Sequence, residues 1–167
     1  MNIFYLSDCP ETAARYHCDK HASKMVLETA QMLSAAHRYL DGDDYADTHG
    51  LYRMGKGHIN HPSTKWVRAS VDHYKWTLDL FWYLADEKLQ RFGKPHKSAD
   101  LLHGLSVVPE NMDDDGFEPP PQCMPDEYKC DDTVRAYRNY YHGEKPFATW
   151  KYTQQPVWWK GYRYYEA

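Results

Sequence analysis

The sequence predicts a compact, single-domain, mainly α-helical fold with long ordered loops and little or no sheet. Its 167 residues fit one domain, so residues 1–167 are treated as a single unit. Two long segments repeat apolar residues at steps of three and four, which is the period of an amphipathic helix. Leu, Ile, Val and Phe make up only about 16% of the chain. Because aromatic residues also form 16% of it, rings must fill much of the core.

The first long helix is predicted over Glu11–Leu40, ending before Gly42. It follows a weakly alternating segment, residues 2–7, which is expected to form a short strand or an extended arm. Residues 41–60 are rich in aspartate and glycine, so we expect a loop there. The core face of the helix is defined by small and apolar residues on one side: Ala22, Val26, Ala30, Leu33, Ala36 and Leu40.

The clearest helix is predicted over Pro62–Phe92. Proline occupies its first position, Asn60 or His61 can cap it, and Gly93 follows its end. A third helix is predicted over Thr133–His142, with Asp131 or Asp132 as its cap. The inward stripe of the second helix consists of Val67, Val71, Tyr74, Leu78, Phe81, Ala85, Leu89 and Phe92.

Charge is segregated along the chain. Residues 109–132 hold nine acidic residues, one lysine and five prolines, which excludes regular helix or central strand. Phe117, Met124 and Tyr128 give this acidic, proline-rich segment apolar anchors, so we expect an ordered loop laid across the body rather than a solvated linker. Residues 145–167, in contrast, form a basic segment rich in aromatic rings.

The composition excludes several classes of protein. The formal net charge of −4 is too small to favour disorder. No stretch approaches the roughly 20 apolar residues of a membrane-spanning helix, and the first residues lack the features of a signal peptide. Four cysteines without a CxxC pair argue against a zinc ribbon or a disulfide framework. We expect a cytoplasmic protein with reduced thiols, no bound metal, no cofactor and no membrane contact; its oligomeric state stays open.

A polar row lies opposite the core face of the first helix. It contains His17, His21, Lys24, Glu28 and Gln31. Lys24 and Glu28 are four residues apart, so each can shift the pKa of the other. The two histidines can transfer a proton near neutral pH or, with Glu28, ligate a metal, although HxxxH lacks the glutamate of zinc proteases. We interpret Glu28, Lys24, His21 and His17 as catalytic and Gln31 as substrate-binding; the alternative is an exposed polar face.

The start of the second helix has the features of a phosphate site. Its N-terminal backbone NH groups lie near Lys65 and Arg68, and His58 and His61 add donors or ligands. We therefore expect these four side chains to bind substrate.

Rings alternate with cations in the C-terminal segment, and such a pattern can hold single strands or flipped bases. The alternative is that the rings belong to the core, above all Trp150, Trp158 and Tyr164. The candidate substrate-binding residues of this segment are Trp158, Trp159, Lys160, Tyr162 and Arg163.

Short motifs spread over nearly the whole chain carry a resemblance to known families. They are Asp19-Lys20-His21, Lys24-Met25, Leu27-Glu28, Gln31 to Leu33, Asn60-His61-Pro62, Met124-Pro125-Asp126 and Pro156-Val157-Trp158-Trp159. Together they resemble a family of small proteins of tailed phages, especially cyanophages. More distantly, the architecture is similar to the phage pyrimidine-dimer DNA glycosylases, which are compact and helical. The resemblance implies that Glu28 is the catalytic carboxylate and that Trp158, Trp159, Lys160 and Tyr162 contact DNA.

One feature departs from the glycosylase pattern. Those enzymes use the α-amino group of a processed N-terminus to form an imine with the sugar, whereas Asn2 here is a bulky second residue that favours retention of Met1. Lys24 is then the substitute amine that we favour over the α-amine. Without an imine, Glu28 would orient a water molecule for hydrolysis. The isoelectric point near 6.2 argues against tight binding of long duplex DNA.

These observations predict a base-directed enzyme whose partner is DNA or a nucleotide, most concretely a DNA N-glycosylase-like phage protein of the host cell cytoplasm. A second hypothesis is a phage protein that binds and sequesters a nucleotide without turnover. A third is a metal-dependent hydrolase that uses His17, His21 and either His58 or His61 as ligands.

Overall fold

The computed structural model describes residues 2–164, and this part of the chain is helical and contains no strand. The predicted mainly α-helical fold class is therefore confirmed. None of its helices is both long and apolar enough to cross a membrane. In chain order the helices are α1 (Pro10–Tyr16), α2 (Asp19–Asp41), α3 (Asp44–Thr48), α4 (Lys56–Ile59), α5 (Pro62–Ala69), α6 (Val71–Phe92), the 3-10 helix η1 (Lys97–Leu101), α7 (Leu102–Leu105), the 3-10 helix η2 (Asp126–Tyr128) and α8 (Thr133–Glu144).

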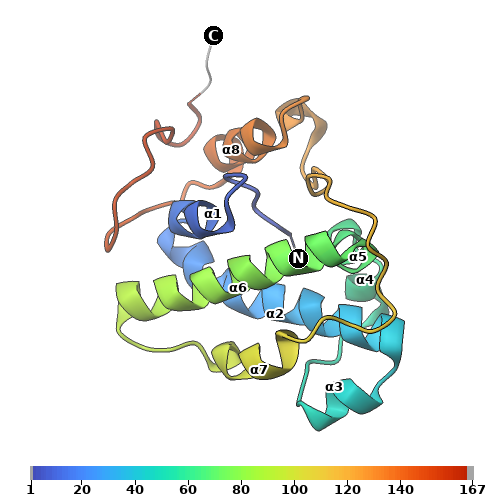
Figure 1. The fold of residues 1–167 in the computed structure, drawn as a ribbon. Helices are drawn as coiled ribbons and strands as arrows, with labels where there is room; N and C mark the ends of the chain where they lie inside the picture. Colours follow the sequence, from blue (N-terminus) through green and yellow to red (C-terminus); the bar gives the residue numbers. More distant parts are fainter. Residues whose placement is uncertain (1, 165–167) are drawn as a thin grey trace.

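Helices α2 and α6 run side by side through the middle of the molecule (Figure 1). The small residues predicted to form the core face of α2 are buried, which lets neighbouring helices approach closely. Larger buried side chains come from α6, among them Tyr74, Phe81 and Leu84. Helix α5 packs on α2 as well. Because α2 is covered on several sides, its polar residues do not all reach solvent.

Each of the two long predicted helices is broken once. The backbone of His17 is extended, with ψ 132°, so α1 ends there and α2 starts two residues later. Ser70 is extended too, with φ −155° and ψ 146°, and it separates α5 from α6. Its hydroxyl accepts a hydrogen bond from the backbone NH of Asp72 and so caps α6. The predictions of one continuous helix over Glu11–Leu40 and over Pro62–Phe92 were therefore wrong.

A buried arginine stabilises the break between α1 and α2. Arg91, near the end of α6, donates from Nη1 to the carbonyl oxygen of His17 at 2.7 Å and from Nη2 to that of Arg15 at 2.9 Å. Its Nε donates to Glu87 at 2.9 Å, and Nη1 lies 3.4 Å from a carboxylate oxygen of Asp19. In a continuous helix the carbonyl oxygens of Arg15 and His17 would accept backbone NH groups of the next turn. Here they accept hydrogen bonds from Arg91, which lies on α6.

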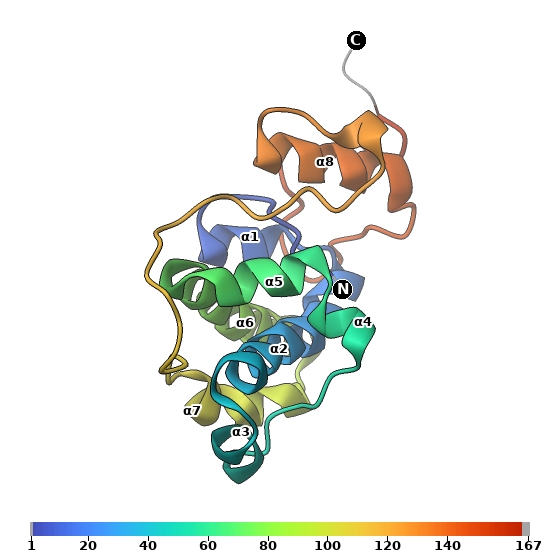
Figure 2. The ribbon, with the colours of Figure 1, turned by 90° about the vertical axis from the view of Figure 1, so that its right-hand side faces the viewer.

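The N-terminal arm lies between the central helices and α8 (Figures 1 and 2). Residues 3–6 are buried although the arm is not part of a sheet. Arg138 of α8 donates to the carbonyl oxygen of Leu6, and the indole of Trp76 on α6 donates to that of Asp8. The arm is therefore a core element, and of the two predicted forms it takes the extended one.

The chemistry at several helix ends agrees with the sequence. Pro62 is the first residue of α5 and His61 caps it, Gly93 takes the left-handed conformation (φ 72°) after α6, and Asp132 caps α8. The predicted loop 41–60 contains the short helices α3 and α4. Residues 97–105, for which no element was predicted, form η1 and α7.

The acidic segment crosses the outside of α5 and α6 (Figure 2). The Ser70 hydroxyl donates to the carbonyl oxygen of Gly116, and the Trp66 indole donates to that of Glu118 at 2.9 Å. The backbone NH of Glu118 in turn donates to Nε2 of His73 at 3.0 Å. Side chains of α5 and α6 thus hold the loop backbone, while most of its carboxylates face solvent.

Candidate functional site

The centre of the candidate site is the pair Lys24 and Glu28 on α2. The ammonium nitrogen of Lys24 lies 3.7 Å from Oε2 of Glu28. Only 12% of the Glu28 side chain is exposed, against 61% of the Lys24 side chain. The carboxylate therefore lies at the edge of the core on a long helix, which fixes its position, and the lysine lies between it and solvent.

His61 contributes a second polar group. It ends the turn after α4 and caps α5, because its Nδ1 accepts the backbone NH of Ser63 at 3.1 Å. In the neutral ring the proton is then on Nε2. Burial lowers the pKa of His61, while the carboxylate of Glu28 acts in the opposite direction. Glu28 and His61 therefore lie within electrostatic range, although they are 33 positions apart in the sequence.

Lys145 is a further amine within electrostatic range of Lys24. Lys145, just after α8, is half-buried, and its ammonium lies 4.3 Å from the centre of the Tyr140 ring and 5.5 Å from that of Phe4. Burial is the main cause of the lowered pKa of Lys145; Glu144 opposes it, and the charges of Lys24 and Lys20 add to it. Sequence analysis did not single out Lys145 as an amine, because only the fold brings it near α2.

His17 and His21 are interior groups. His17 ends α1 and is fully buried, with its Nδ1 2.6 Å from the carbonyl oxygen of Ala13. His21 stacks on Phe4 with ring centres 4.4 Å apart, and its Nδ1 is 2.7 Å from the Tyr141 hydroxyl. Burial lowers the pKa of His17 to about 4 and that of His21 to about 2. The structure thus places both neutral rings in the core and not on an open face beside Lys24 and Glu28.

The predicted phosphate site at the start of α5 is not assembled as expected. Arg68 is buried, donates to the carbonyl oxygen of Ile59 and stacks 3.8 Å over the Tyr39 ring, so its guanidinium holds α4 and α2 together. The NH of Ser63 is used by His61. Among the other substrate-binding side chains predicted on α2 and around the start of α5, His58 and Lys65 are exposed, and Gln31 and His61 are partly exposed.

The two tail tryptophans pack in a cluster of rings. Trp159 stacks on His142 with ring centres 4.9 Å apart, and Trp150 lies 5.3 Å from Trp159. Trp158 contacts the edge of Tyr141. Trp150 and Trp159 therefore belong to the core and Trp158 packs against it partly buried. Tyr164, for which a core position was the alternative, is exposed, as are Lys160, Tyr162 and Arg163.

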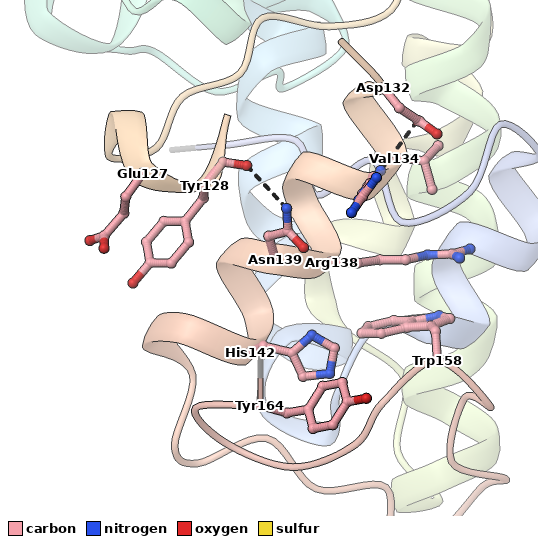
Figure 3. Close-up of a pocket in the computed structure, with 10 residues that line it drawn as sticks. Glu127, Tyr128, Asp132, Val134, Arg138, Asn139, His142, Trp158 and Tyr164 are labelled. Atoms are coloured by element: carbon pink, nitrogen blue, oxygen red, sulfur yellow. Dashed lines mark hydrogen bonds between the residues drawn. The ribbon is translucent and has the colours of Figure 1, made fainter. Parts of the chain in front are cut away.

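A cavity of about 500 Å³ lies between α8, η2 and the tail (Figure 3). In Figure 3, Trp158, His142 and Tyr164 lie at one end and Glu127 and Tyr128 to one side. The indole nitrogen of Trp158 is buried, and within residues 2–164 it has no hydrogen-bond partner. Sequence analysis predicted rings and cations in the tail but did not predict this cavity.

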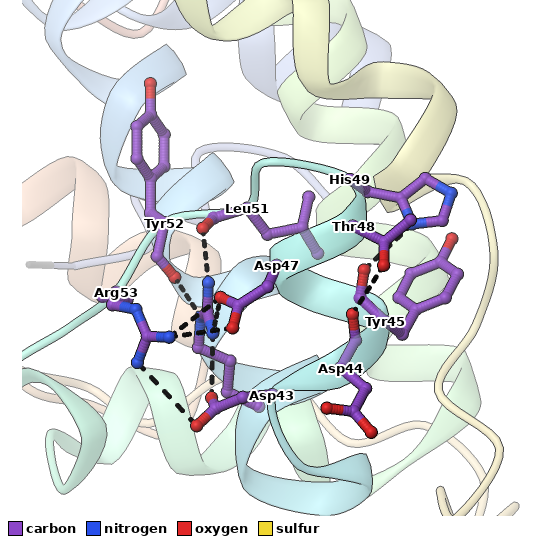
Figure 4. Close-up of polar contacts among 10 residues, drawn as sticks. Asp43, Asp44, Tyr45, Asp47, Thr48, His49, Leu51, Tyr52 and Arg53 are labelled. Atoms are coloured by element: carbon purple, nitrogen blue, oxygen red, sulfur yellow. Dashed lines mark hydrogen bonds and ion pairs between the residues drawn. The ribbon is translucent and has the colours of Figure 1, made fainter.

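A separate charged cluster near α3 is structural (Figure 4). Arg38 donates to Asp43 and Asp47 at 2.8 Å each, and Arg53 donates to both oxygens of Asp47. Arg38 also donates to the carbonyl oxygen of Tyr52. Because these charges neutralise one another, the cluster fastens the 41–60 segment to the end of α2.

Across residues 2–164 no group of three or more His, Cys, Asp or Glu side chains has a spacing that could hold a metal ion. The ligand set of the metal-hydrolase hypothesis is also divided, because His17 and His21 are interior while His58 is exposed on α4. The comparisons with known proteins give no match to a family model, to a curated protein or to a solved structure.

Proposed function

We propose that this protein is a base-directed enzyme of nucleic acids or nucleotides, most concretely an N-glycosylase-like enzyme acting on DNA. The observation that carries the proposal is the Glu28 carboxylate, fixed on the central helix at the edge of the core and paired with Lys24. The resemblance of the sequence to phage glycosylases points to the same carboxylate.

Glu28 has a role in either route of base removal. Cleavage of an N-glycosidic bond leaves positive charge on the sugar, and a fixed carboxylate stabilises that charge. In the hydrolytic route, water forms a bond to C1′, the glycosidic C–N bond breaks, and its electron pair leaves with the base. Glu28 accepts the proton of the water. Neutral His61 can donate a hydrogen bond from Nε2 to the departing base, which takes its proton from solvent.

In the amine route, a neutral amine attacks C1′ in place of water. A C–N bond to the amine forms while the glycosidic bond breaks, and Glu28 accepts the proton that the amine nitrogen loses. Lys24 was the predicted amine. The structure supports Lys145 as a second candidate, because burial and its lysine neighbours lower its pKa and so raise its neutral fraction.

The test is base release from oligonucleotides that carry damaged or modified bases, with Glu28→Gln beside the wild type. The amide keeps the shape of the side chain but accepts no proton, so we expect release to slow by about a hundredfold or more. Glu11→Gln, an exposed change in the first turn of α1, is the matched control and should keep the wild-type rate. Equal rates in wild type and Glu28→Gln, or no release by either across a broad panel, would overturn the proposal.

A further inference from the structure

A groove of about 410 Å³ lies between the beginning of α2 and the end of α6. Both of these helix ends lie on the left in Figure 1. It is lined by Asp19, Lys20, Ser23, Lys24, Lys88 and Phe92, and we refer to it as the lysine groove. Lys24 borders both this groove and Glu28, so the groove leads to the candidate site.

The lysine groove is positively charged. Lys20 and Lys24 are exposed and Lys88 is half-exposed. The acid in the lining, Asp19, already has partners, since one of its oxygens accepts the backbone NH of Lys151 at 2.8 Å and the other lies 3.4 Å from Arg91. In a protein whose net charge is −4, such a local excess of cations favours an anionic ligand.

Two exposed rings outside the lining, Phe147 and Tyr152, contact residues that line the groove. The ammonium of Lys20 is 4.4 Å from the centre of the Phe147 ring, and Tyr152 meets Phe92 edge-on at 5.4 Å. Phe147 is 38% exposed and Tyr152 is 60% exposed. Their segment is fixed to α2, because the NH of Asp19 donates to the carbonyl oxygen of Thr149 at 2.8 Å. Rings held next to cations fit a ligand with both phosphates and flat bases.

We propose that the lysine groove binds a single-stranded nucleic acid, with phosphates on Lys20 and Lys88 and unpaired bases against Phe147 and Tyr152. An unpaired strand is favoured over a duplex because stacking on protein rings requires exposed base faces. An acidic peptide or an anionic membrane would use the lysines but leave the rings without a role. The inference rests on the proposed function, since both take a nucleic acid as the ligand, and it names the form of the strand and its path.

The test is binding of a fluorescent thymidine oligonucleotide of about 12 residues, measured by anisotropy between about 50 and 200 mM salt. Because each phosphate contact to a single strand contributes about 0.7 to the slope of log K against log salt, Lys20→Gln/Lys88→Gln should reduce the slope by about 1.4. Lys56→Gln/Lys75→Gln removes two exposed lysines elsewhere and should leave it unchanged. Phe147→Leu should weaken binding about tenfold at constant slope.

Three results would overturn the inference. The first is that Lys56→Gln/Lys75→Gln reduces the salt slope as much as Lys20→Gln/Lys88→Gln does. The others are that a duplex of the same sequence binds as tightly as the single strand, or that a polyglutamate peptide competes as well as the oligonucleotide. The proposed function fails separately. A protein that binds the strand through the lysine groove but releases no base refutes only the proposed enzyme activity. If the wild type releases base and the Lys20→Gln/Lys88→Gln variant still binds the strand with unchanged affinity and salt slope, only the proposed binding role of the lysine groove is refuted.

Discussion

Histidine serves mainly as a neutral interior group in this protein. His21 and His17 lie against Phe4, and His73 on α6 donates from Nδ1 to the carbonyl oxygen of Trp66 and accepts from Glu118. In each of these rings Nδ1 has a hydrogen-bond partner. Protonation would place a charge in the core or break the bond to the acidic loop.

Acid should therefore destabilise the fold through its buried histidines. The folded-state pKa values of His17 and His21, about 4 and about 2, lie below the ordinary value of 6.5. The unfolded chain thus binds more protons, so their contribution to stability is present above about pH 6.5 and is lost as the pH falls toward 4. We expect each to cost about 2 to 3 kcal/mol between pH 7.5 and 4.5.

Urea unfolding at these two pH values measures the loss. His21→Gln, whose amide can still bond Tyr141, should show a smaller difference between the two pH values than the wild type. His58→Gln, at an exposed position on α4, should show the same difference as the wild type. An unchanged difference in His21→Gln would contradict this account.

Lys145 should be an unusually reactive amine. Its lowered pKa gives it more neutral amine near neutral pH than an ordinary lysine has. We expect treatment with a small aldehyde and a hydride donor at limiting reagent to modify Lys145 ahead of the exposed Lys65 and Lys75, as read by peptide mass spectrometry. If Lys145 is modified last, the amine route has no support from this residue.

At the scale of elements, the sequence predicts helices and faces better than it predicts breaks. The apolar period runs through Ser70 almost undisturbed, so α5 and α6 look continuous, although a serine two residues before Asp72 is a helix-cap signal. The break at His17 had no comparable signal. It depends on Arg91, more than 70 positions away, whose hydrogen bonds only the folded chain supplies.

Arg91 should accordingly be one of the most sensitive side chains. Replacing it with Met leaves the carbonyl oxygens of His17 and Arg15 and the acids Asp19 and Glu87 without their buried cation. We expect a loss of about 3 kcal/mol or more in the free energy of unfolding. Arg135→Met, at an exposed position on α8, should change it by less than about 0.5 kcal/mol. Similar effects of the two substitutions would show that the bonds of Arg91 add little.

The candidate site was predictable only in part. The four-residue spacing of Lys24 and Glu28 on one helix follows from the sequence, and the pair is present. His17 and His21 are interior because α8 and the N-terminal arm pack on them. No local sequence pattern predicts that packing. For the same reason the tail rings looked like a binding surface, while Trp159 lies in the core and Trp158 packs against it.

Over the whole molecule, opposite charges occupy opposite ends of α6. The acidic loop is bound at Ser70 and His73, at the start of the helix, and the lysine groove is formed at Lys88 and Phe92, at its end. At about 1.5 Å per residue the two regions are separated by some 25 Å. Such a field attracts a polyanion to the groove end of α6 and repels it from the loop end.

Turnover is the most direct test of the central claim that the protein removes a base and does not merely hold a ligand. An excess of oligonucleotide carrying a modified base is incubated with the protein, and free base and intact strand are quantified by mass spectrometry over time. The account predicts many equivalents of free base per protein with the wild type and almost none with Glu28→Gln. Recovery of the ligand intact, at no more than one bound equivalent per protein, would contradict it and favour sequestration.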